Sequence, residues 1–345
     1  MNLHPATAAQ DSYLIPHTSY LSVWYVRLLL AACLLFGSEI LLWTNPPGRA
    51  LAEWPLLIAG YSALATLLLD LMLRYRIHDL TGVMLLAGIY GLLAGLLLNP
   101  QTALVDLPHT LVTRVMGGHT LLGLETIGLF LALTGGNRRR ARSLLLAGSG
   151  VVGLAWGIWV RWFSVLDVRP FGEVSLTTMF VYGIAGIVGI GLLLRLAASN
   201  AASLSPGVLR LSGRAFGALV VALLALLLVR LLQGAIALAA LIAIPLLLAL
   251  CLAILWFRRS DKKGTLLDTR IPLRPLRLLW LLAATAFFFL MGFLAYHLPF
   301  VEVANVNQLT LVILGFTAFG MGWLPLVSLV LGVRAAARLT RERRL

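Results

Sequence analysis

The stretch "AIALAALIAIPLLLALCLAILWF", Ala235–Phe257, contains no Asp, Glu, Lys or Arg. At a rise of about 1.5 Å per residue, a helix of this length crosses the roughly 30 Å hydrocarbon core of a bilayer. Hydrocarbon offers no hydrogen-bond partner to an exposed backbone, so the stretch must be helical there. It therefore predicts a transmembrane helix.

Similar apolar runs recur along the whole chain. Its 345 residues are 60% hydrophobic and 12% charged, whereas soluble domains carry about 25% charged residues. We predict an all-α, polytopic transmembrane bundle of about ten spans. The expected spans are Ser22–Trp43, Trp54–Leu73, Leu80–Leu98, Gly117–Thr134, Ser143–Trp162, Leu176–Ala197, Arg214–Leu232, Ala235–Phe257, Leu276–Tyr296 and Leu309–Val333.

The positions of Lys and Arg predict how the chain is threaded. The connections after the even-numbered spans, with the C-terminal tail and Arg27, carry 22 of the 27 Lys and Arg residues, and the other connections carry 5. Cytoplasmic loops are enriched in Lys and Arg, so both termini are predicted to be cytoplasmic in a cell membrane. Arginine far outnumbers lysine, which suggests a prokaryotic gene.

We expect five regions along the chain. They are a cytoplasmic N-terminal segment (1–21), the first six spans (22–198), a cytoplasmic linker (199–213), the last four spans (214–333) and a basic cytoplasmic tail (334–345). The net charge of +14 belongs to these membrane flanks, and nucleic-acid binding is not predicted because it requires a basic folded domain. Seven Lys and Arg residues in Arg258–Arg277 predict contact with anionic lipids beside the bilayer.

Three acidic residues lie within predicted spans and are the main candidates for chemistry. Glu39 lies near the outer end of its span, Glu125 near mid-membrane, and Asp70 near the cytoplasmic end. A charged side chain at the centre of a membrane helix costs about 2.5–3.5 kcal/mol on insertion scales, so these groups are expected to face inward or to be paired. Such a ladder of acids favours coupling of transport to protons or cations.

Each acid also has a structural interpretation. Asp70 precedes Arg74 by four residues, which favours an ion pair along one helix face. Glu39 has the outer arginines Arg161 and Arg230 as candidate partners, and Glu125 is a candidate for an interhelical hydrogen bond.

The histidines offer an alternative chemistry. His119 and His297 both fall near the predicted outer face, and paired histidines can ligate haem. A haem protein is therefore an alternative, although no cofactor or metal site is predicted, because Cys33 and Cys251 are isolated in apolar runs.

The tenth span carries Gly320, Gly322 and Pro325 near mid-membrane. Proline removes a helix hydrogen bond and clashes with the preceding turn, so this span is expected to be kinked or discontinuous. Broken helices hold substrates in transporters, and we include these three residues in the candidate site. A packed proline kink is the structural alternative.

Aromatic and small residues predict packing. Trp156, Trp159 and Trp162 crowd the outer end of the fifth span, as an interfacial aromatic belt would. The GxxxG pairs Gly91 with Gly95 and Gly153 with Gly157 predict close helix contacts.

Three functions remain open. The first is a permease for an unknown small solute, coupled to ions or protons through Glu39, Asp70, Glu125 and His119. The second is a non-catalytic scaffold or subunit that binds another membrane protein. The third is an intramembrane enzyme acting on lipid or quinone, with a polar cluster drawn from Glu39, His109, Arg114 and His119. No residue is assigned as catalytic.

Overall fold

The computed structural model is all-α and 84% helical, and the residues that it describes include ten helices long and apolar enough to cross a membrane. It describes residues 18–44, 46–136, 139–162, 174–200, 204–258, 264–271, 273–299 and 307–342. The predicted fold class and the ten spans are confirmed, and the orientation of the termini stays a prediction. Most of the N-terminal segment, the residues 259–263 of the basic loop and the last three residues of the tail lie outside the described residues.

The long helices follow the predicted spans closely, and three of the spans contain π-helical segments. The long helices are α1 (Thr18–Leu35), α2 (Glu53–Arg74), α3 (Leu80–Leu93), α5 (Thr120–Thr134), α6 (Arg139–Trp162), α7 (Leu176–Asn200), α8 (Gly213–Leu232), α9 (Leu238–Arg258), α10 (Leu278–Tyr296) and α11 (Gln308–Glu342). The π-helical segments are η1 (Phe36–Leu41), η3 (Ala94–Leu98) and η4 (Leu111–His119), and α4 (Pro100–Ala103) is a short helix between the last two.

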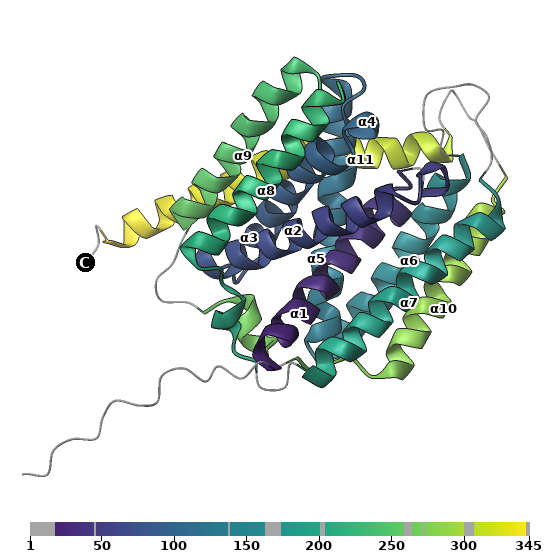
Figure 1. Cartoon of the computed structure of the whole chain (residues 1–345), viewed down its shortest axis with the longest axis horizontal. Helices are drawn as coiled ribbons and strands as arrows, with labels where there is room; N and C mark the ends of the chain where they lie inside the picture. The colour runs from purple at the N-terminus through teal and green to yellow at the C-terminus, as the bar shows by residue number, and fades with distance from the viewer. Residues whose placement is uncertain are drawn as a thin grey trace, which may run out of the picture.

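The first four spans form the interior of the bundle, where α1, α2, α3 and α5 lie together (Figure 1). In the most apolar 18 residues of the span Leu80–Leu98, 83% of the residues are buried inside the protein. In the most apolar 18 residues of α8, none is buried. Glycines permit this packing: the position that a Cβ would take on Gly91 lies 2.2 Å from Thr120 Oγ1. A polar group placed among these four spans is therefore held away from lipid.

The helices α6 and α10 run side by side in the same direction. Gly153 packs against the backbone of Phe288, and Gly157 packs one turn further along against the backbone of Gly292. These contacts confirm the predicted close approach at the second GxxxG pair. The ring of Trp156 stacks on Phe288 with 4.8 Å between centroids, which fills the space beside the glycines.

The tryptophans of α6 pack inward, so the predicted aromatic belt is wrong for two of the three. Trp156 and Trp159 are buried, and their indole N–H groups donate to the carbonyl oxygens of Ile40 and Leu42 at 2.8 and 2.6 Å. Carbonyl groups at the end of a helix lack intrahelical partners. The indoles therefore cap the end of the first span.

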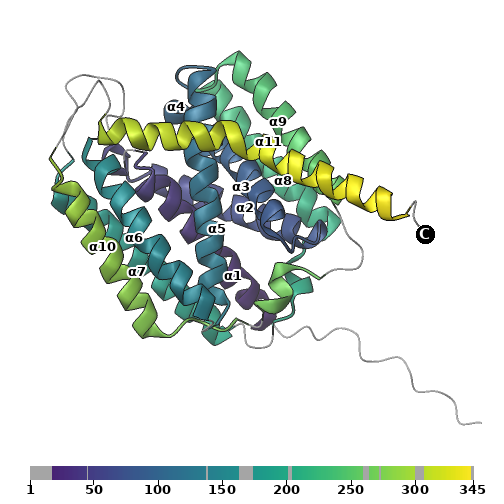
Figure 2. The same ribbon diagram turned by 180° about the vertical axis from the view of Figure 1, so that it is seen from behind.

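The helix α11 crosses over the η4 segment on the far side of the bundle (Figure 2). The crossing is close at two glycines, because a Cβ on Gly117 would lie 2.3 Å from the carbonyl oxygen of Phe316, and one on Gly320 would lie 2.2 Å from that of Val112. The helix is continuous through Pro325, so the discontinuous tenth span that we predicted is not observed. Whether Pro325 kinks the helix stays a prediction.

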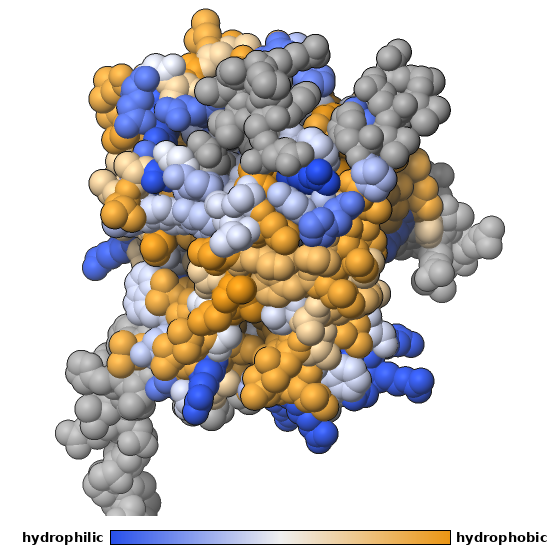
Figure 3. Space-filling view, turned by 90° about the vertical axis from the view of Figure 1, so that its right-hand side faces the viewer, coloured by the Kyte–Doolittle hydropathy of each residue, from blue (hydrophilic) through white to orange (hydrophobic). Residues whose placement is uncertain are grey.

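The helices α8 and α9 form a hairpin at one side of the bundle (Figure 1). Gly234 closes the turn between them with φ = +65°, a conformation that favours glycine. Arg230 anchors the hairpin by donating to the carbonyl oxygens of Leu97 and Leu98 at 2.9 and 3.3 Å. Apolar side chains dominate the middle of the face shown in Figure 3, as expected for contact with lipid.

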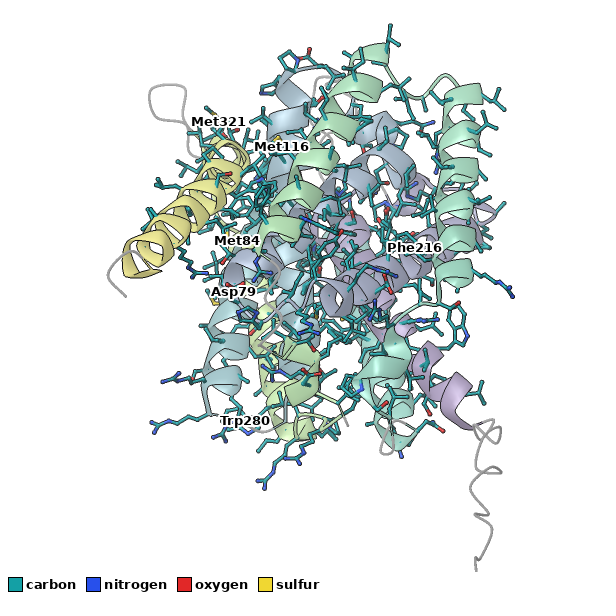
Figure 4. The ribbon with its side chains drawn as sticks, turned by 90° about the vertical axis from the view of Figure 1, so that its left-hand side faces the viewer. Asp79, Met84, Met116, Phe216, Trp280 and Met321 are labelled. Carbon is teal, nitrogen blue, oxygen red and sulfur yellow. The ribbon has the colours of Figure 1, made fainter. Side chains whose placement is uncertain are left out.

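The start of α3 joins α9 and α11 through Asp79 (Figure 4). Asp79 caps α3 by accepting from the Gly82 N–H at 3.0 Å, and it pairs with Arg258 and with Arg334, the latter at 2.9 Å. Burial alone would raise the pKa of the Asp79 carboxyl, but the Gly82 hydrogen bond and the charge of Arg258 hold it below its ordinary value. This side chain ties three helices together at one end of the bundle.

Candidate polar site in the first four spans

Three π-helical segments bring polar side chains together at one end of the first four spans. The segment η1 carries Ser38 and Glu39, η3 ends at Asn99, and η4 carries His119. The η3 and η4 segments pack against each other, and η1 packs against α5. π-Helical turns are rare and occur frequently at functional sites. These segments mark the candidate site.

Glu39 is the centre of this polar site and is fully buried. Its Oε1 atom accepts from the Tyr61 hydroxyl at 2.6 Å and from Asn99 Nδ2 at 3.0 Å. Its Oε2 atom accepts from the Thr44 hydroxyl and from Arg49, whose Nη2 lies 2.8 Å away. Both oxygens thus have two donors, which offsets the cost of burying the carboxylate.

Arg49 is the partner that the sequence did not reveal. We expected Arg161 or Arg230 to pair with Glu39, but both of these donate to carbonyl oxygens at helix ends. A 3₁₀ turn at Pro46–Gly48 folds the chain back after the first span and returns Arg49 to η1. The side chain of Arg49 is 14% exposed, so the site reaches toward the surface at this point.

A second polar contact lies beside the first. His119 is buried, and its Nδ1 atom lies 2.7 Å from the hydroxyl of Ser38, the neighbour of Glu39 in the chain. Tyr90, on α3, donates its hydroxyl to the carbonyl oxygen of Leu34 at 3.1 Å, close to the same segment. The polar groups from Arg49 at the edge of the bundle to His119 inside it therefore lie close together, because Glu39 and Ser38 are adjacent in η1.

Asp70 lies at the opposite end of α2 and does not join this site. Nine residues of helix separate it from Tyr61, a rise of about 14 Å. Its Oδ2 atom pairs with Arg74 Nε at 2.8 Å, and its Oδ1 atom accepts from the backbone N–H of Leu211 at 2.8 Å. The predicted ion pair with Arg74 is confirmed.

Glu125 lies on α5, six residues beyond His119 in the chain. Its Oε2 atom is buried and has no hydrogen-bond partner among the described residues. Glu125 forms no ion pair with any of the described residues. The interhelical hydrogen bond that we considered is therefore not found at this oxygen. A methyl group added to Gly128, one turn further along α5, would have nothing within 4 Å, so no other helix packs closely there.

The remaining candidates lie at the edges of the bundle. His297 and His109 are exposed, so the structure does not place either beside the buried His119. Gly320 packs on η4, whereas Gly322 and Pro325 are exposed along α11. Within the described residues there is no group of three or more His, Cys, Asp or Glu side chains suited to a metal ion.

Five residues of the site were not predicted from the sequence, which are Ser38, Thr44, Arg49, Tyr61 and Asn99. Asn99 is a polar residue at the end of an apolar span, and the "NPPGR" turn carries an arginine on the side of the membrane where arginines are rare. Both were usable signals. The burial of Tyr61 against Glu39 depends on how α1 and α2 pack, which the sequence does not show.

Comparisons with protein-family models, with curated proteins and with solved structures found no match to this chain. The function must therefore be argued from the geometry.

The arrangement suits the handling of protons or of a small polar group. Carboxyl, hydroxyl and imidazole side chains each bind and release protons, and here they lie in series inside the bundle. The Arg49–Glu39 pair holds a positive and a negative charge at the edge of the bundle, where Arg49 is partly exposed.

Proposed function

We propose that the protein is a permease for a small polar solute, in which movement of the solute is coupled to protons through the polar site around Glu39. The observation that carries this proposal is the buried series of polar groups from Arg49 to His119 in the first four spans. Polar and ionisable groups inside a membrane bundle are costly and usually mark ion or substrate pathways.

In this proposal, Glu39 and His119 are the coupling residues. A proton or a polar solute that reaches Glu39 competes with Arg49 for its carboxylate, and release of Arg49 loosens the loop that closes the site. Glu125, with its unpartnered buried oxygen, is a second proton-binding candidate. The proposal gives no coupling role to Asp70, which is paired with Arg74, to Gly320, which packs on η4, or to Gly322 and Pro325, which are exposed along α11.

The test uses the purified chain in sealed vesicles that contain a trapped pH-sensitive dye. Amino acids, monosaccharides and sugar phosphates are added outside in turn, and the internal pH is followed. We expect one class to drive internal acidification, and we expect Glu39→Gln to abolish this response while the protein stays folded. Glu53→Gln, which changes an exposed side chain, serves as the control. If all three classes leave the internal pH unchanged, the proposal fails.

A second function, a non-catalytic subunit of a membrane complex, is favoured by the arginine partners of Glu39 and Asp70. Paired acids need no solute to neutralise them and can simply hold helices together. In this case Glu39→Gln lowers the stability of the protein and no solute class moves protons. The vesicle experiment therefore separates the two functions.

A further inference from the structure

The arginine residues around the starts of α6 and α10 form a surface that the proposed function does not use. The parallel arrangement of these helices places their N-terminal ends side by side, and the guanidinium of Arg142 lies 4.8 Å from the ring centroid of Trp280. Trp280 is labelled in Figure 4. The backbone of Arg274 forms a bridge with Gly135, just before α6 begins. We define the α6/α10 arginine cluster as Arg139, Arg140, Arg142, Arg274 and Arg277.

These five arginines have no carboxylate partner among the described residues. Three other arginines at this end of the bundle are paired, because Arg74 pairs with Asp70, and Arg258 and Arg334 pair with Asp79. Arg142 is partly buried and its Nε atom lacks a hydrogen-bond partner in the described part of the chain, while the other four side chains are exposed. The cluster is thus a positive surface without counter-charge among the residues that the structure describes.

The chemistry of this surface fits a phosphate group. Guanidinium groups form paired hydrogen bonds with phosphate oxygens, and the two helix N-termini add positive partial charge. Directly next to the arginines along α6 and α10, the apolar side chains of Leu144, Leu278 and Leu279 are about 70% exposed. A ligand that carries a phosphate and an acyl chain satisfies both parts of the surface, whereas free phosphate leaves the leucines uncovered.

We propose that the α6/α10 arginine cluster binds the headgroup of an anionic phospholipid, whose acyl chains lie along Leu144 and Leu278. This site lies at the opposite end of the bundle from Glu39 and does not depend on the proposed function. We predicted from the sequence that the segment Arg258–Arg277 contacts anionic lipid. The proposed site includes only Arg274 and Arg277 from that segment, together with the arginines at the start of α6.

The experiment measures binding of a short-chain phosphatidylglycerol to the purified full chain in a neutral detergent, through its effect on thermal stability. Phosphatidylcholine of the same chain length and inorganic phosphate are the comparison ligands. We expect stabilisation by phosphatidylglycerol alone, and at least tenfold weaker binding after all five arginines are changed to glutamine.

The matched control changes Arg210 and Arg214, which are exposed arginines near the start of α8. This double variant is expected to bind phosphatidylglycerol as the unmodified chain does. If the fivefold variant fails to fold, the double variant Arg274→Gln/Arg277→Gln, which changes two exposed side chains, is measured instead. Equal binding by the cluster variant and the control, or equal stabilisation by inorganic phosphate, would overturn the proposal.

Discussion

Arg49 Nη2 lies 2.8 Å from Glu39 Oε2, and the two residues are joined by a turn of only a few residues at the end of the first span. Glu39 is fully buried while Arg49 is 14% exposed. The pair therefore closes the polar site at the point where it meets the surface.

We expect the separation of this pair to destabilise the protein. Removing one partner of a buried ion pair leaves an uncompensated charge and costs about 3–5 kcal/mol. Arg49→Gln should therefore lower the free energy of unfolding by an amount in this range, measured by thermal or denaturant unfolding in detergent. Glu53 also contacts Arg49, but its side chain is 52% exposed. Glu53→Gln should therefore change the free energy of unfolding by less than about 1 kcal/mol. Similar effects of the two substitutions would contradict the burial of the pair.

We expect the opposite result at Glu125. Its buried Oε2 atom has no partner among the described residues, so Glu125→Leu removes an unsatisfied polar atom and breaks no hydrogen bond at that oxygen. The variant should be as stable as the unmodified protein or more stable, whereas Glu39→Leu should be strongly destabilised. A large loss of stability in Glu125→Leu would show that this carboxyl has a structural partner.

The crossing of α11 over η4 gives a test with two glycines of one helix. A methyl group at Gly320 would lie 2.2 Å from the carbonyl oxygen of Val112, so Gly320→Ala must move the backbone and should cost about 1–3 kcal/mol. Gly322 has nothing within 4 Å, so Gly322→Ala should be neutral or stabilise by up to about 1 kcal/mol through helix propensity. Unfolding measurements on the two variants check this, and equal effects would mean that the crossing is not close.

The lowered pKa of Asp79 predicts a pH dependence of stability. A carboxyl whose pKa is lower in the folded state contributes stability above its ordinary value of 3.8, and this contribution is lost as the pH falls through the folded pKa. Thermal unfolding followed from pH 6 to pH 3 should therefore show a decline at the acidic end that is smaller in Asp79→Asn. At pH 6 the variant itself should be less stable, because Arg258 loses its charged partner. If Asp79→Asn loses as much thermal stability between pH 6 and pH 3 as the unmodified protein does, groups other than Asp79 cause the loss.

The predicted orientation is open to a direct measurement. Gln101 and Ser205 are both exposed and lie at opposite ends of the bundle, so each can carry an introduced cysteine. The native Cys33 and Cys251 are buried and should give little background. With intact cells, a membrane-impermeant thiol reagent should modify Gln101→Cys and leave Ser205→Cys unmodified. The reverse result would invert the topology.

The sequence predicted the spans because hydrocarbon imposes one physical requirement, an apolar helix of sufficient length, on each of them. It also predicted the Asp70–Arg74 pair, since residues four apart share a helix face. The partners of Glu39 could not be predicted in this way. Asn99 and Tyr61 reach Glu39 from other spans, and their approach depends on widened π-helical turns and on side-chain packing that leave no periodic pattern in the sequence.

The inward direction of Trp156 and Trp159 was missed for the same reason. A tryptophan at the end of a span satisfies its N–H equally well with lipid headgroups or with carbonyl groups of a neighbouring helix. The neighbour that decides between them is the end of the first span, more than a hundred positions earlier in the chain.

The parallel contact between α6 and α10 also governs how the chain can be assembled in the membrane. Three further spans separate α6 from α10, so Gly153 and Gly157 enter the bilayer long before the helix that covers them has been synthesised. During that interval the glycine groove of α6 faces lipid or a membrane insertase. Assembly therefore includes a late docking step, and a chain that stops after α9 would leave this groove uncovered by α10.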